Sequence, residues 1–467
     1  MTGNGRAETR GSGVFVSPRR DPADRPGRVF AAAYDGRMGV PHDLSTATQP
    51  ETATQTATAT QPTTATQPTT APAVTESEQP PATSTPATST PAATTPATST
   101  PATSNGPSPL LGLPGAVPAS GFDNGTAWHY GDPIGEQRAS LTGSILIDLS
   151  NRAMLTVSGP DRLTWLHTLT SQFLSTLGEG EATQALILSP QGHVEHHAWV
   201  TEIGGVTYLD AEPGAGIALR EYLDSMRFWS KVEVGDGSRD VAQLALIGPR
   251  SAAVVQHVLG VSAPAPGRAV PIAAAGFVRS TTDGLDVFLA RAELPRVAAA
   301  LIAAGAVPAG SWAADALRIP TRRPRWGLDT DERTIPNEVP WLHTAVHLEK
   351  GCYRGQETVA RVHNLGRPPR RLVMLNLDGS ADRLPITGDA VTTTQGRVVG
   401  RVGTVAQHHE DGPIALALVK RGMDSGTALM AGPVDAAVDP ADLADEPDQS
   451  MPVSAIDRRA LRDIRRG

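Results

Sequence analysis

The densest group of chemically capable residues is an octapeptide built around the single cysteine of the chain. Lys350-Gly351-Cys352-Tyr353-Arg354-Gly355-Gln356-Glu357 places a thiol between two glycines and two cations. Because glycine permits tight backbone conformations, a ligand could approach the sulfur closely. Lys350 and Arg354 favour the thiolate form of Cys352, and a helix that begins near Gln356 would act in the same direction. The alternative is a small buried hydrophobe, which is how most free cysteines behave.

Histidines gather at two places and raise the question of a metal site. One group lies within residues 193–197, and the other pairs His343 with His347 at helical spacing near Cys352. No carboxylate or further ligand stands at a matching spacing, so we expect no metal site. A Cys–His nucleophilic pair lacks support as well, because no protease signature surrounds the thiol.

The elements that must position these residues alternate between strand-like and helix-like patterns. The folded body is expected to begin near Gly121, and a second block from Lys231 to Arg318 repeats the order strand, helix, strand, strand, helix. Helices mixed with hairpin-linked strands favour an α+β fold over a doubly wound parallel sheet. After Gly366 the segments are β-rich and punctuated by glycine, which predicts a small C-terminal β-barrel module.

These patterns divide the chain into four parts. Residues 1–120 are rich in Thr/Pro/Ala repeats, whose burial could not offset the backbone entropy lost on ordering, so we predict a disordered tail. Residues 121–345 are expected to form two α+β subdomains, and residues 346–434 the cysteine motif with the barrel module. Residues 435–467, acidic and then basic, are predicted to be a second disordered tail.

Charge and cysteine content exclude several classes of protein. The net charge of −8 argues against direct binding of nucleic acid by the whole molecule. One cysteine excludes an internal disulfide framework and the four thiolates of an iron–sulfur cluster held by a single chain. No export signal and no apolar run of transmembrane length is visible, so we expect a cytoplasmic protein without a membrane partner.

The octapeptide KGCYRGQE matches the KGCYxGQE signature of YgfZ-type folate-binding proteins, and the resemblance extends from about Leu141 to Val419. Three further segments carry it: LTVSGPDRLTWLHTLTSQ, LSPQGHVEHHAWV and ADALRIPTRRPRWGLDTDERTIPNEV. The wider superfamily includes the glycine-cleavage T-protein, an aminomethyltransferase, and the folate-binding domains of sarcosine and dimethylglycine dehydrogenases. The resemblance implies an aminomethyltransferase-like cloverleaf of domains around tetrahydrofolate or a one-carbon derivative of it.

The resemblance also implies which residues would hold the folate. Arg318 matches a superfamily arginine near the cofactor, and Asp286 falls where the T-protein has a glutamate that grips the pterin ring. A carboxylate suits that place because two oxygens can accept the adjacent N–H donors of the pterin edge. Further candidates for contact with folate are Trp312, Glu195, Tyr353 and Gln356. The alternatives are a surface carboxylate for Asp286 and a core tryptophan for Trp312.

By the same resemblance, the chain would be a tetrahydrofolate-binding accessory protein that supports assembly or repair of iron–sulfur enzymes, and indirectly tRNA modification, with Cys352 beside the folate cleft. The rival is a folate-dependent aminomethyltransferase or methyltransferase. The T-protein has paired aspartates in the strand after its Gly-Gly turn, where this chain reads Gly192-His193-Val194-Glu195-His196-His197, and that loss argues against ordinary aminomethyl transfer. A third class is a non-catalytic scaffold.

Overall fold

The computed structural model describes residues 106–273, 276–422 and 426–443. The chain divides into two units, residues 1–97 and 98–467, and every described residue belongs to the second. Most of the predicted N-terminal tail and most of the predicted C-terminal tail therefore lie outside the described residues. Within the described ranges, no helix combines the length and the apolar character needed to cross a membrane.

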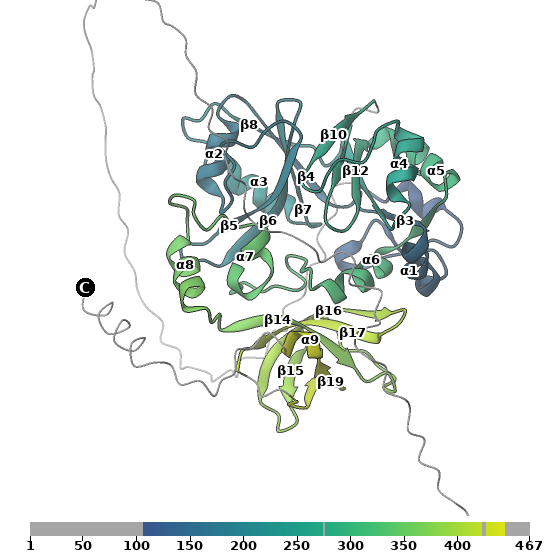
Figure 1. Ribbon diagram of the computed structural model, residues 1–467, viewed down its shortest axis with the longest axis vertical. Helices are drawn as coiled ribbons and strands as arrows, with labels where there is room; N and C mark the ends of the chain where they lie inside the picture. Colours follow the sequence, from purple (N-terminus) through teal and green to yellow (C-terminus); the bar gives the residue numbers. More distant parts are fainter. Residues whose placement is uncertain (1–105, 274–275, 423–425, 444–467) are drawn as a thin grey trace, which may run out of the picture. The chain divides into compact units, whose positions relative to one another are not determined.

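Helices in the described ranges are short (Figure 1). They are α1 (Pro133–Thr142), α2 (Arg162–Leu169), α3 (Gly216–Ser225), α4 (Ser251–Leu259), α5 (Leu294–Ala303), α6 (Ser311–Arg318), α7 (Trp341–Thr344), α8 (Gln356–Leu365) and α9 (Pro440–Leu443). Single 3-10 turns join several of them: η3 (Pro109–Gly112), η4 (Gly121–Asp123), η5 (Arg291–Glu293), η6 (Ile319–Thr321) and η7 (Pro336–Glu338).

The first sheet is antiparallel and carries α2 and α3 on one face. Its strand order is β5 (Glu181–Leu188), β6 (Val194–Ile203), β7 (Val206–Ala211), β4 (Ala153–Ser158) and β8 (Glu233–Asp236). Leu219 and Leu223 are one helical turn apart on α3, so both face the sheet, where they pack with Leu155 and Val200. The opposite face of this sheet packs in part on the second sheet, through Met154 and Ile203, and in part on α7, through Leu186 and Leu188.

The second sheet is formed by segments from both predicted blocks. Its strand order is β10 (Ala269–Ile272), β11 (Gly276–Ser280), β12 (Leu285–Ala290), β9 (Val241–Ile247), β3 (Ser144–Asp148) and β13 (Ala306–Ala309). The strand β3 comes directly before β4 in the chain, yet it pairs with β9 and, in parallel, with β13. The two blocks are therefore interleaved rather than consecutive, because the chain enters the second sheet before it builds the first.

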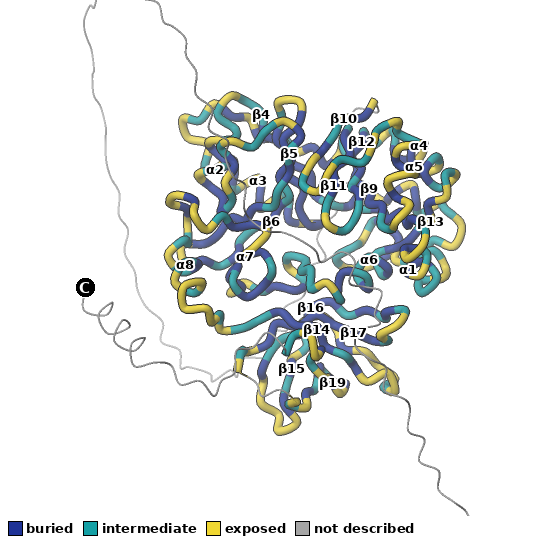
Figure 2. Tube along the Cα trace, viewed as in Figure 1, coloured by how far each residue is buried: buried dark blue, intermediate teal, exposed yellow. Residues whose placement is uncertain are grey.

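The predicted C-terminal barrel is confirmed as a closed ring. The strands follow the order β14 (Arg370–Leu377), β17 (Gly412–Lys420), β16 (Val398–His408), β15 (Ala390–Thr393), β18 (Leu429–Ala431) and β19 (Val434–Val438), and β19 pairs with β14. On β14, Val373 and Leu375 belong to the barrel core, whereas Leu372 and Met374 belong to a second core shared with α7 and the octapeptide. Figure 2 shows burial along the strands and exposure in the loops.

Described elements cross two of the boundaries predicted from the sequence. Before Gly121, η3 and the strand β1 (Val117–Pro118) are formed, and β1 pairs with β2 (Ala127–His129). After residue 434, β19 continues to Val438 because its alternate residues Val434 and Ala436 are buried against the barrel core. Asp435 between them, and Asp439 and Asp442 after them, gave this segment the composition of a tail.

Candidate functional site

A cavity of about 370 Å³ is lined by residues of the two sheets, of helix α6 and of the loop that follows this helix. Its size is within the range of small-molecule sites. Charged side chains of both signs line it: Asp210, Glu212, Asp283, Asp286, Asp315, Arg152, Arg279, Arg318, Arg323 and Arg325. Aromatic rings complete the walls: His197, Trp199 and Trp341. Carboxylates and guanidiniums are equal in number along this lining, so the cavity is polar without being strongly cationic.

Strand register aligns the polar residues of the cavity in one row across both sheets. In the first sheet this row consists of Gln184, Trp199 and Asp210, and in the second sheet it consists of Arg279, Asp286 and Ala245. Asp210 and Arg279 meet where the two sheets join. Residues that are far apart in sequence are thus brought to one level of the cavity by strand pairing within each sheet and by the Asp210–Arg279 ion pair between the sheets.

Arg279 is fully buried and joins the two walls. Its Nη1 lies 2.5 Å from Oδ1 of Asp210, and its Nη2 lies 3.0 Å from Oδ2 of Asp210 and 2.7 Å from Oδ2 of Asp286. The guanidinium also lies over the rings of Trp199 and Phe288, at 4.6 and 4.8 Å from their centroids. Burial opposes the charge, but the two carboxylates raise the pKa of Arg279 above its ordinary value. One cation facing two carboxylates leaves a net negative group at this end of the cavity.

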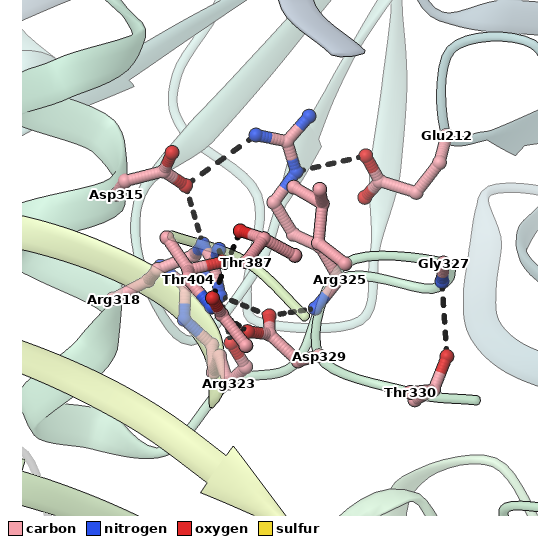
Figure 3. Close-up of polar contacts among 12 residues, drawn as sticks. Glu212, Asp315, Arg318, Arg323, Arg325, Gly327, Asp329, Thr330, Thr387 and Thr404 are labelled. Atoms are coloured by element: carbon pink, nitrogen blue, oxygen red, sulfur yellow. Dashed lines mark hydrogen bonds and ion pairs between the residues drawn. The ribbon is translucent and has the colours of Figure 1, made fainter. Parts of the chain in front are cut away.

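A second network of charges forms the other end of the cavity (Figure 3). Arg318 Nε donates to Asp315 Oδ1 at 2.7 Å, and Arg325 Nε donates to Glu212 Oε2 at 2.9 Å. Arg318 also donates to the hydroxyl of Thr404 on β16, so its buried guanidinium ties α6 to the barrel. Although burial raises the pKa of Glu212, the neighbouring arginines, chiefly Arg152 and Arg325, lower it to about 2.

Two of the residues predicted to contact folate line this cavity, Asp286 and Arg318. Asp286 stands at the negative end with its side chain 13% exposed, so part of the carboxylate remains accessible. Arg318 is 5% exposed and its guanidinium already donates to Asp315, Asp329 and Thr404. These contacts describe a residue that shapes the wall of the cavity.

The other predicted contact residues lie away from the cavity lining. The ring of Trp312 stacks on Trp128 with centroids 4.6 Å apart. Glu195 forms an ion pair with Arg354, with Oε2 and Nη1 2.9 Å apart. Tyr353 is buried in the core shared by α7 and the barrel, and burial raises its pKa to about 12. Trp312 and Tyr353 therefore pack against neighbouring side chains, and Glu195 forms an ion pair at the surface.

The octapeptide places its thiol at the surface. Cys352 is exposed and is not among the residues that line the cavity. Lys350 Nζ donates to the backbone oxygens of Thr170 and Gln172, at 2.7 and 2.9 Å, and burial lowers its pKa to about 8. Gln356 Nε2 donates to the carbonyl of Lys350 at 3.1 Å. Within the octapeptide, Cys352 is therefore exposed, whereas Lys350 and Tyr353 are buried and anchor the segment.

Sequence reasoning missed several residues of the cavity wall: Asp210, Arg279, His197, Trp199 and Trp341. The period-2 pattern of β6 could have found two of them, because His197 and Trp199 are two residues apart and share one face of the strand. Grouping the histidines by proximity in sequence hid this alternation. Within residues 106–273, 276–422 and 426–443, no group of three or more His, Cys, Asp or Glu side chains is placed to hold a metal ion.

Comparisons with known proteins relate this chain to one family. Residues 122–350 match the family described as the GCVT N-terminal domain. An aminomethyltransferase of Thermus thermophilus is 31% identical over 311 residues, which cover 63% of this chain and 85% of that protein. A putative chloroplastic transferase of Arabidopsis thaliana is 29% identical over 276 residues, which cover 56% of this chain and 61% of that protein.

A solved structure gives the same fold. The glycine cleavage system aminomethyltransferase T of Bartonella henselae superposes with a TM-score of 0.62 over 70% of this chain and 93% of that protein, at 20% identity. At this identity the likeness establishes the shared fold. The family follows from the Thermus relative, of which this chain covers 85%, and from the match of residues 122–350: the chain belongs to the aminomethyltransferase family with a GCVT N-terminal domain.

Proposed function

We propose that this chain is a tetrahydrofolate-binding accessory protein of the YgfZ type and that its folate site is the cavity between the two sheets. The observation that carries the proposal is the negative end of that cavity, where Asp286 remains partly accessible beside the buried Arg279. A pterin edge presents adjacent N–H donors that such a carboxylate can accept. Trp199 and Trp341 supply the apolar surface that a planar ring requires.

The proposal assigns Cys352 to a surface role. The thiol is exposed, so it is accessible to another protein without entry into the cavity. In this proposal, Cys352 acts on iron–sulfur enzymes that the protein supports during assembly or repair, while tetrahydrofolate or a one-carbon derivative occupies the cavity. Any effect on tRNA modification then passes through those enzymes, and the net charge of −8 agrees with the lack of a direct nucleic-acid partner.

Calorimetric titration of the full chain with tetrahydrofolate tests the proposal. We expect saturable binding, and we expect Asp286→Asn to weaken it about tenfold because a charge-assisted hydrogen bond is replaced by a neutral one. The matched control is Asp224→Asn, which makes the same change on the exposed side of α3 and should leave the affinity unchanged. Absence of binding by the wild-type protein would contradict the proposal.

A second candidate is turnover as an aminomethyltransferase, favoured by the relatives that bear this name. The segment from Glu195 to His197 opposes it, because no aspartate stands there. Incubation with tetrahydrofolate and aminomethyl or methyl donors separates the two candidates. Steady formation of a one-carbon folate would establish the transferase, whereas binding without turnover supports the accessory protein.

A further inference from the structure

The imidazole ring of His197 forms part of the cavity wall, and its contacts hold it in one orientation. The family resemblance assigns no role to this residue. His197 lies on β6, 7% exposed, and lines the cavity together with Trp199 on the same face of the strand. The adjacent His196 is on the opposite face, where its ring lies near Tyr222 and Trp326. Of these two neighbouring histidines, only His197 is among the lining residues.

Two contacts hold the imidazole of His197. Its ring stacks on Trp341 with centroids 4.4 Å apart and planes 12° apart. Its Nε2 lies 2.9 Å from Oε1 of Gln184, which also lies 3.5 Å from the hydroxyl of Thr344. The backbone of Gln184 is itself held, because the side-chain amide of Gln172 donates to its carbonyl oxygen. The ring is therefore fixed in both position and rotation.

The contact with Gln184 assigns the tautomer. Oε1 of Gln184 lies against the ring, and an amide oxygen only accepts, so with Gln184 in this orientation Nε2 carries the proton and donates. In the neutral ring, Nδ1 then keeps its lone pair. Burial lowers the pKa of His197 to about 4, which keeps the ring neutral at physiological pH. His197 lines the cavity. One face of its ring packs on Trp341 and Nε2 is held by Gln184, so the other face and Nδ1 are the parts of the ring that these contacts do not use.

We infer that His197, oriented by Gln184 as a positioning residue, accepts through Nδ1 a hydrogen bond from a ring N–H of the heterocycle bound in the cavity. This inference rests on the proposed folate site and adds a determinant of specificity to it. The ligand class is a planar nitrogen heterocycle with N–H donors on its edge, such as a reduced pterin. A heterocycle that presents only acceptors along that edge would face the lone pair of Nδ1 and be rejected.

Calorimetry with tetrahydrofolate on the full chain provides the first measurement. We expect His197→Phe, which keeps an aromatic ring on Trp341, to weaken binding about tenfold, the effect of one lost hydrogen bond in a dry site. His196→Phe is the matched control on the other face of β6 and should bind like the wild type. Melting curves without ligand show whether each variant is folded.

A spectroscopic measurement separates orientation from structural support. In ¹⁵N spectra of labelled histidine, His197 should appear as the Nε2–H tautomer, and its Nδ1 resonance should shift when tetrahydrofolate binds. Gln184→Leu should lose the single tautomer and weaken binding, whereas Gln184→Glu, which retains an acceptor, should restore the tautomer. A residue with only a structural role would change the melting temperature without this pattern.

The outcomes of these experiments distinguish the role of His197 from the proposed binding of tetrahydrofolate. If the wild-type protein does not bind tetrahydrofolate, the proposed function fails and the inference fails with it. If the wild type binds and His197→Phe binds equally well while folded, or if Nδ1 does not respond to the ligand, the folate site stands and the role of His197 is overturned.

Discussion

Lys350 and Arg354 flank Cys352 in the sequence, but both cations are held by other groups. The ammonium of Lys350 donates to backbone oxygens around the end of α2, and the guanidinium of Arg354 pairs with Glu195. The flanking charges therefore join the octapeptide to α2 and β6. At the scale of residues, the sequence shows that two cations flank Cys352, and the hydrogen bonds of Lys350 and Arg354 show that both cations hold neighbouring elements.

The role of Cys352 leads to a prediction at the same scale. Because the thiol is exposed and outside the cavity lining, Cys352→Ala should leave the melting temperature and the affinity for tetrahydrofolate unchanged. It should abolish support of iron–sulfur enzymes, measured as their activity in cells that lack the wild-type protein. Glu357→Gln changes another exposed residue of the octapeptide and serves as the control. Full support by Cys352→Ala would contradict a role for the thiol.

Between elements, the turn of the β5–β6 hairpin fits tightly against the start of α8. Gly355 has φ +82°, and a Cβ built there would lie 2.6 Å from the carbonyl oxygen of Ser189 and 2.8 Å from the Cα of Gly192. Gly192 has φ +84°. The second glycine of the octapeptide is thus required by the contact between two backbones. The first, Gly351, has open space around the position of a Cβ.

This contact predicts that substitution of Gly355 lowers the free energy of unfolding, whereas substitution of Gly351 does not. Gly355→Ala should lower the free energy of unfolding by about 2 kcal/mol or more, because an L-residue is strained at this φ and its Cβ would overlap the hairpin. Gly351→Ala is the matched substitution four residues earlier and should change stability little. Urea unfolding of both variants provides the comparison. Equal free energies of unfolding for the two variants would contradict this prediction, because the β5–β6 hairpin would then accommodate the added Cβ at position 355 without loss of stability.

Sequence patterns predicted elements better than they predicted how the elements meet. Alternation such as that of β14 is local, so the barrel and the hairpins could be inferred from short windows. The pairing of β3 with β9 depends on contacts about a hundred residues apart, and no local period records it. The cavity shares this property. Asp286 was predicted from the resemblance, whereas its partner Arg279 and the second carboxylate on Arg279, that of Asp210, lie in different sheets and carry no common motif.

For the molecule as a whole, buried titratable groups make the free energy of unfolding depend on pH in the acid range. The ring of His197 has its pKa lowered to about 4 by burial, so the fold favours the neutral form. The unfolded chain takes up this proton first, near pH 6.5. The corresponding stability is therefore complete above pH 6.5 and is lost as the pH falls from there through 4.

Glu212 should dominate the next interval of pH. Burial raises its pKa, but Arg152 and Arg325 bring it from the ordinary 4.5 down to about 2, so its contribution is present above pH 4.5 and lost as the pH falls through 2. At about 1.4 kcal/mol per pH unit, this loss amounts to about 3 kcal/mol. Glu212→Gln should therefore be less stable at pH 7 and show a flatter decline below pH 4.5, measured by urea unfolding at a series of pH values. Glu221→Gln, an exposed residue of α3, should follow the wild type, and parallel curves for all three proteins would show that the pairing of Glu212 does not hold the fold together.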